Sequence, residues 1–203
     1  MIAIVDYGVG NLFSLVSSFA MINKEAIATS DEAVIRSADK IILPGVGAFE
    51  DAIAKLRSSG LDKVLIEEAG RGKPLLGICL GMQLLFERSY EYGVHEGLGL
   101  ISGEIRPIAE VIDPSLKIPH IGWNALEIIK EQNGLFKNIN NGDCVYFVHS
   151  YYGADCAEDT SAVAEYSAKL TAAVAKGNVY GCQFHPEKSG EVGLNILRAF
   201  AEL

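Results

Sequence analysis

Short apolar runs alternate with amphipathic segments over roughly the first eighty residues of the chain. The apolar runs are typical of buried strands, and they cover residues 2–6, 26–29, 40–43 and 75–78. Apolar residues recur every three or four positions between them, which predicts helices over residues 12–22, 50–58 and 61–69 and a short one from residue 31. Strands that alternate with helices predict a parallel sheet covered by helices on both faces.

The pattern changes in the second half of the chain. Glycines, prolines and short apolar runs alternate over residues 89–143, which favours hairpins or bent strands over helices. One strong strand is predicted over residues 144–152, and further strands and a closing helix over 162–167, 171–176, 179–184 and 191–203. We therefore expect an α/β fold with an open, mostly parallel sheet and additional antiparallel strands in the C-terminal half. No linker interrupts the pattern, so residues 1–203 are expected to form a single domain.

Three local features refine this expectation. Ser30 stands where an N-cap would begin the short helix. The apolar pattern after Cys79 predicts a helix over residues 80–87. The sequence Gly8-Val9-Gly10 lacks the third glycine of a dinucleotide-binding fingerprint, so a tight turn between strand and helix is the better interpretation.

Composition and charge exclude several classes of protein. The 203 residues are 49% hydrophobic and 21% charged, as in an ordinary globular protein, and the net charge of −9 disfavours a nucleic-acid partner. No apolar run approaches the roughly 20 residues of a membrane-spanning helix, so no membrane partner is expected, and the N-terminus does not have the pattern of a secretory leader. Four cysteines without CxxC spacing indicate reduced thiols and a cytoplasmic protein.

Cys79 follows a predicted strand and precedes a predicted helix, with Gly77 and Gly81 on either side. This is the pattern of a nucleophile elbow, in which a sharp turn presents the nucleophile and glycines allow neighbouring backbone to approach closely. A buried structural cysteine would also explain an isolated Cys in an apolar run. The choice depends on whether the chain also supplies a base, an orienting carboxylate and an oxyanion site.

His185 and Glu187 are candidates for the base and the carboxylate. Both follow a predicted strand, as Cys79 does, and Pro186 between them restricts their relative orientation. A histidine oriented by a carboxylate is the arrangement that activates a nucleophilic cysteine. A zinc site using Cys182 and His185 is disfavoured, because no second closely spaced ligand pair is present. No metal or other cofactor is therefore expected.

The segment 44–49, Pro-Gly-Val-Gly-Ala-Phe, follows the third predicted strand. Glycines at the carboxyl end of a parallel strand expose backbone N–H groups, which can hold an oxyanion. A simple turn explains the same residues equally well. His149, at the end of the strand predicted over residues 144–152, is likewise either a site residue or a capping histidine.

The segments Gly-Ile-Cys-Leu-Gly-Met-Gln at residues 77–83 and Gln-Phe-His-Pro-Glu at residues 183–187 resemble the class I, triad-type glutamine amidotransferases. Segments at 6–12, 44–49, 119–124, 147–151 and 185–189 are similar to the glutaminase subunits of imidazole glycerol phosphate synthase. Together the matching segments span nearly the whole chain. The stretches 96–117 and 153–162 carry no matching motif.

The resemblance implies hydrolysis of glutamine to glutamate and ammonia through a thioester, with no cofactor. It implies Cys79 as nucleophile, His185 and Glu187 as its partners, and an oxyanion site from the backbone of Leu80 and of Val46 and Gly47. It further implies that the substrate is held by Gln83, Glu91, Ser150 and Tyr151. The ammonia would pass to a separate (β/α)8-barrel cyclase subunit of histidine biosynthesis, forming a heterodimer. By the same resemblance, the docking face is assigned to Asn11, Trp123, Asn124 and Lys188.

Three other hypotheses about the function remain as alternatives to a histidine-pathway glutaminase. One is the glutaminase subunit of a different synthase, against which Gly122-Trp123-Asn124 and Lys188-Ser189 argue. Another is a cysteine peptidase or chaperone on a similar scaffold, against which Gln83 argues because it lies one helical turn after the cysteine. A third is a non-catalytic interaction protein, which the intact cysteine, histidine and glutamate disfavour. Without the resemblance, Trp123 would be assigned to the core.

Overall fold

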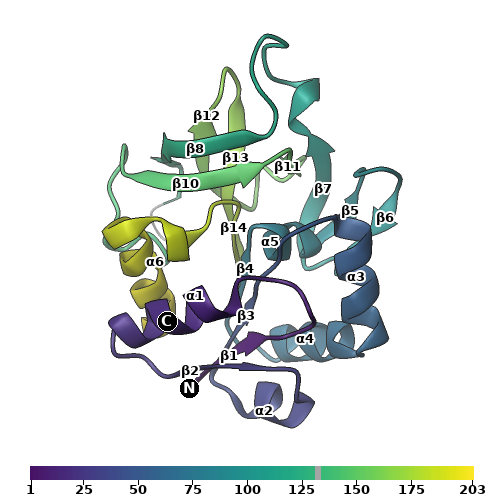
Figure 1. Ribbon diagram of the computed structural model, residues 1–203, viewed down its shortest axis with the longest axis vertical. Helices are drawn as coiled ribbons and strands as arrows, with labels where there is room; N and C mark the ends of the chain where they lie inside the picture. The colour runs from purple at the N-terminus through teal and green to yellow at the C-terminus, as the bar shows by residue number, and fades with distance from the viewer. Residues whose placement is uncertain (131–133) are drawn as a thin grey trace.

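A computed structural model of the protein describes residues 1–130 and 134–203 (Figure 1). It is built on an eight-stranded sheet with the strand order β2-β1-β3-β4-β14-β13-β12-β9. The strands in that order are Ala26–Thr29, Ile2–Val5, Lys40–Leu43, Leu75–Ile78, Val179–Cys182, Lys169–Lys176, Thr160–Glu165 and Glu127–Ile128. Pairing is parallel from β2 to β14 and antiparallel from β14 to β9. The predicted mostly parallel sheet with added antiparallel strands is confirmed.

Helices cover both faces of the parallel strands, as predicted. They are α1 Leu12–Met21, α2 Glu32–Ser37, α3 Phe49–Ser58, α4 Leu61–Gly70, α5 Leu80–Leu84 and α6 Gly190–Glu202. Alternate residues of a strand point to opposite faces, so in β1 Ile2 and Ile4 join the cluster under α1 and α6. Ala3 and Val5 join the cluster under α2, α3 and α4. The two layers of core therefore follow from the apolar pattern of each strand.

Two smaller sheets lie beside the carboxyl ends of the parallel strands. One pairs β8 (His120–Ala125) with β10 (Cys144–His149) in antiparallel fashion. The other has the order β11-β7-β5-β6, with the bounds Tyr151–Ala154, Ile101–Pro107, Phe86–Ser89 and His95–Glu96. Two 3-10 helices complete the description, η1 at Ile108–Glu110 and η3 at Pro186–Lys188. The described part of 89–143 contains the short strands β6, β7, β8 and β9 and no α-helix, which agrees with the prediction.

Three local predictions were wrong. Asp31, not Ser30, caps α2, because its carboxylate accepts the Ala33 N–H at 2.8 Å. The helix predicted to reach residue 87 ends at Leu84. The carbonyl groups of residues 84 and 85 accept N–H groups from residues 98, 100 and 101 instead of continuing the helix, so the chain turns into β5.

The third wrong prediction is the single strand over residues 144–152, which is divided into two strands in the structure. It divides at Ser150, whose carbonyl oxygen accepts the Ile108 N–H at 3.0 Å, so that β10 and β11 pair in different sheets. Among the described residues, no helix is long and apolar enough to cross a membrane.

Candidate active site

Cys79 lies at the turn between β4 and α5, with φ 54° and ψ −113°. Backbone of this kind is strained for any residue with a side chain. A Cβ atom on Gly81 would lie 1.8 Å from the Leu43 carbonyl oxygen, and one on Gly77 would lie 2.6 Å from the Gly81 carbonyl oxygen. The glycines therefore allow the close approach of backbone that the elbow pattern predicts. The helix that follows is only five residues long.

The parallel pairing of β4 and β14 brings the base to the cysteine. Ile78 lies opposite Cys182, so the residues that follow both strands emerge at the same edge of the sheet. His185 Nδ1 lies 2.8 Å from Glu187 Oε1, and both side chains are buried. Burial alone would lower the pKa of His185, but its hydrogen bonds with Cys79 and Glu187 outweigh burial and raise it to about 9. The sulfur, the imidazole and the carboxylate thus lie at the same edge of the sheet.

The loop that follows β3 packs against the elbow. Tyr7 Oη donates to the Pro44 carbonyl oxygen at 2.7 Å, and a Cβ on Gly45 would lie 2.8 Å from the Gly81 nitrogen. Val46 and Gly47 line the same cavity as Cys79 and Leu80, and Gly47 has φ +94°. This loop therefore borders the cavity that Cys79 lines.

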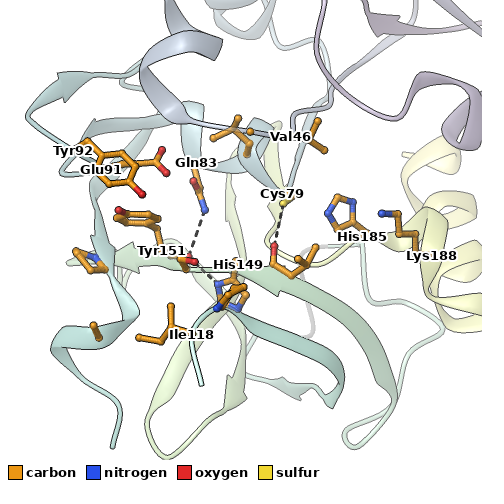
Figure 2. A pocket seen from close by; sticks show the side chains of 17 residues that line it. Val46, Cys79, Gln83, Glu91, Tyr92, Ile118, His149, Tyr151, His185 and Lys188 are labelled. Atoms are coloured by element: carbon orange, nitrogen blue, oxygen red, sulfur yellow. Dashed lines mark hydrogen bonds between the residues drawn. The ribbon is translucent and has the colours of Figure 1, made fainter. Parts of the chain in front are cut away.

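The cavity has a volume of about 630 Å³ and contains all four predicted substrate residues (Figure 2). Gln83 Nε2 donates to the Tyr151 carbonyl oxygen at 3.4 Å. Glu91 Oε2 accepts the Phe49 N–H at 2.5 Å, and burial raises the pKa of the Glu91 carboxyl despite this bond. Ser150 links β10 to Tyr151, the first residue of β11, and this Ser150–Tyr151 turn lines the cavity. The lining of the cavity thus combines carboxylate, amide and backbone polar groups.

Gln183 is a site residue to which the sequence gave no role of its own. It is fully buried, its Oε1 accepts from Gln83 Nε2 at 2.9 Å, and its Nε2 lies 3.8 Å from the Cys79 sulfur. Its position directly after β14, among apolar residues, was the available signal. His149 lines the cavity, and its Nδ1 lies 2.8 Å from the Tyr151 carbonyl oxygen.

The four residues assigned to docking lie on connected elements. Asn11 caps α1, accepting the Ser14 N–H at 3.4 Å, and Lys188 in η3 lines the cavity. Helix α1 contacts η3, η3 contacts β10, and β10 pairs with β8, which carries Trp123 and Asn124. Trp123 is 58% exposed, so it is not a core residue. The placement of these residues is compatible with one surface beside the cavity mouth.

Metal ligation finds no support in the described part of the chain, where no cluster of three or more His, Cys, Asp or Glu could hold an ion. Cys182 is fully buried, and burial raises the pKa of its thiol. That shift favours the neutral thiol over the thiolate that a metal requires.

A doubly wound sheet with a cysteine, a histidine and a glutamate after its strand ends is the arrangement of triad-type hydrolases, and comparison with known proteins identifies the family. The family model for class I glutamine amidotransferases matches residues 3–202. The chain therefore belongs to the class I glutamine amidotransferase family.

Within that family it belongs with the HisH subunits. It is 49% identical to the imidazole glycerol phosphate synthase subunit HisH of Oceanobacillus iheyensis over 100% of this chain and 99% of that one. It is 52% identical to the subunit HisH of Bacillus cereus strain G9842, covering 98% and 93% of the two chains.

Solved structures agree on the fold. A structure described as a glutamine amidotransferase matches with a TM-score of 0.76 at 18% identity, covering 99% of both chains. The PurLQS structure from Thermotoga maritima matches with a TM-score of 0.71 at 21% identity, covering 99% of this chain and 97% of that one.

Proposed function

We propose that this chain hydrolyses L-glutamine to L-glutamate and ammonia, and that it supplies the ammonia to a separate cyclase subunit of histidine biosynthesis. The cyclase would make imidazole glycerol phosphate and aminoimidazole carboxamide ribotide. The observation that carries the proposal is the set formed by Cys79, His185 and Glu187 at the edge of a cavity that also holds Gln83 and Glu91. The chain is 49% and 52% identical to two HisH subunits over nearly their full length, which supports the assignment to the histidine pathway.

Catalysis begins when the Cys79 sulfur attacks the side-chain amide carbon of glutamine. His185, whose raised pKa means that it has already taken the thiol proton, delivers this proton to the departing nitrogen, so ammonia leaves and a glutamyl thioester remains. His185 Nδ1 donates to Glu187 Oε1, 2.8 Å away, so His185 Nε2 is the nitrogen that takes part in this proton transfer. His185 then deprotonates a water molecule that attacks the thioester, giving glutamate and the free thiol.

Each attack places negative charge on the amide or thioester oxygen. Backbone N–H groups at Leu80 and at Val46 and Gly47 are assigned to this oxyanion, because these residues line the cavity around Cys79. Preorganised donors at this point stabilise the transition state more than the substrate.

The rest of the substrate is assigned to the opposite side of the cavity. The Glu91 carboxylate attracts the α-ammonium group of glutamine, and the backbone at Ser150 and Tyr151 holds the α-carboxylate. Both Nε2 protons of Gln83 are used by Tyr151 and Gln183. Its Oε1 is therefore the atom available to accept a hydrogen bond from the substrate.

The proposed partner is a (β/α)8-barrel cyclase that docks on Asn11, Trp123, Asn124 and Lys188 to form a heterodimer. Residues 1–203 are assigned to one amidotransferase domain, which the family match over 3–202 supports. Four free cysteines suit a cytoplasmic location. A net charge of −9 opposes nucleic acid as a partner, and no membrane partner is included.

The test measures glutamate release from glutamine by the purified chain, alone and with a histidine-pathway cyclase. Cys79→Ser should abolish release, whereas Cys144→Ser is the matched control because Cys144 is exposed and is not among the residues that line the cavity. Mass spectrometry of the acid-quenched wild type should find a glutamyl adduct on Cys79 alone. Activity that survives Cys79→Ser, or no release under either condition, would refute the proposal. Equal rates with and without cyclase would refute the coupling.

A further inference from the structure

Two buried histidines are not used by the catalytic steps above. His120 in β8 and His149 at the end of β10 are paired across the two-stranded sheet, and each is at most 5% exposed. His120 Nδ1 lies 3.0 Å from His149 Nε2. The His149 ring is directed at the turn that lines the cavity (Figure 2). Of the four histidines in the sequence, these two are in direct contact with each other.

The proton positions on His149 and His120 follow from the acceptor at one end. A carbonyl oxygen can only accept, so His149 Nδ1, 2.8 Å from the Tyr151 carbonyl oxygen, must carry its proton. In a neutral ring the other nitrogen, Nε2, is then an acceptor. His120 Nδ1 must therefore be protonated and donate to it.

The other end of the chain of hydrogen bonds is fixed by main-chain groups as well. Asn124 Nδ2 donates to the Glu165 carbonyl oxygen at 2.8 Å, and its Oδ1 accepts the Ala125 N–H at 2.8 Å. This settles the orientation of the amide. The second Nδ2 proton points to His120 Nε2 at 3.3 Å. Donors and acceptors thus run in one direction from Asn124 to Tyr151.

The rings are held in place and uncharged. His120 stacks on Tyr166, with ring centroids 4.2 Å apart, and on Phe147 at 5.1 Å. Burial lowers the pKa of His149 to about 4 and also lowers the pKa of His120. Both imidazoles are neutral at pH 7, which is the state that the hydrogen bonds require.

We propose that His120 and His149 are positioning residues that connect Asn124 on β8 to the main-chain carbonyl of Tyr151 and so hold the Ser150–Tyr151 turn in its substrate-binding position. The inference rests on the proposed function, because it assumes that this turn holds glutamine. The same carbonyl oxygen accepts from Gln83 Nε2. The pair therefore acts on glutamine binding and leaves the thioester chemistry at Cys79 unchanged.

Matched substitutions at His149 separate the two hydrogen bonds. An asparagine amide can place its nitrogen where Nδ1 was, so His149→Asn keeps the donor to the Tyr151 carbonyl. His149→Gln reaches the Nε2 position instead and loses that donor. With the cyclase present, His149→Gln should raise the KM for glutamine about tenfold with kcat within about twofold, and His149→Asn should raise KM less than about threefold.

Two further variants control for packing. Tyr166→Phe keeps the stack on His120 and removes the hydroxyl group, which donates to the Lys117 carbonyl oxygen at 2.9 Å and not to either histidine, so KM should stay at the wild-type value. His120→Phe keeps the stack but cannot donate to His149, and it replaces His149→Gln if that variant fails to fold, with the same expected rise in KM. An unchanged KM in a folded loss variant, an equal rise in both His149 variants, or a fall in kcat alone would overturn the proposal.

Nitrogen-15 NMR of histidine-labelled protein gives a readout that does not depend on catalysis. Both His120 and His149 should be in the Nδ1–H tautomer at pH 7, and the signal of His120 should shift in Asn124→Ala. An Nε2–H tautomer in either ring would overturn the proposal. Absence of glutamate release by the wild type would refute the proposed function, whereas an active wild type with unaffected variants would refute only this inference.

Discussion

The elbow at Cys79 stores backbone strain that a substitution can release. Its φ of 54° and ψ of −113° belong to a region that glycine enters freely, and such backbone costs other residues about 1–3 kcal/mol. Cys79→Gly removes this cost, offset by about 0.5–1 kcal/mol for the greater freedom of glycine in the unfolded chain. Cys79→Ala keeps the Cβ atom and the strain. The glycine variant should therefore be more stable than the alanine variant by about 1 kcal/mol.

Urea denaturation of both inactive variants measures this difference, and in a chain of this length about 1 kcal/mol corresponds to roughly 2–4 °C in Tm. Ala54→Gly, on the exposed side of α3, is the control and should lower the free energy of unfolding by about 1 kcal/mol. A glycine variant at position 79 that is less stable than the alanine variant by the same amount as the control would refute the strain argument.

Three more outcomes follow from the site. The pKa of His185 is raised to about 9, so its protonated ring stabilises the folded chain fully below the ordinary pKa of 6.5. This contribution to the free energy of unfolding is lost as pH rises through 9. Glu187→Gln should make that loss smaller in urea denaturations from pH 6 to 10. Gly81→Ala, with a Cβ 1.8 Å from the Leu43 carbonyl oxygen, should lower the free energy of unfolding by about 3 kcal/mol or more. Gln183→Glu replaces the amide donor beside the sulfur by a carboxylate, so kcat should fall about 100-fold in the glutamate-release assay.

The parallel half of the fold could be predicted from the sequence because its signals are local. Each buried strand is a short apolar run, and each covering helix has its own three- and four-residue period. The bounds of β2, β3 and β4 agree with the prediction to the residue. The errors come from tertiary contacts: α5 ends early because residues 98–101 take its last carbonyl groups, which no local pattern records.

The placement of the candidate catalytic residues could be predicted for a related reason. Cys79 and His185 both follow strands that end at one edge of the sheet, and each carries a local signal, glycines for one and a His-Pro-Glu segment for the other. Tyr151 was assigned by the resemblance alone, because the groups assigned to it belong to the backbone and leave no signal in its side chain. The position of Gln183 in the site could not be predicted from the sequence, because it depends on a hydrogen bond with the Gln83 side chain, which comes from a different element.

The order of strands explains how one site can combine fixed chemistry with a separate binding surface. Strands β4 and β14 are neighbours in the sheet, yet between them the chain makes an excursion through α5, the two smaller sheets and β9 before it adds β12 and β13. The sulfur and the imidazole are therefore positioned by sheet pairing. Glu91 and the Ser150–Tyr151 turn belong to the intervening excursion. Because His149 is hydrogen-bonded to the Tyr151 carbonyl oxygen on this excursion, changes at His149 should alter substrate binding more than they alter the geometry of the elbow and its partners.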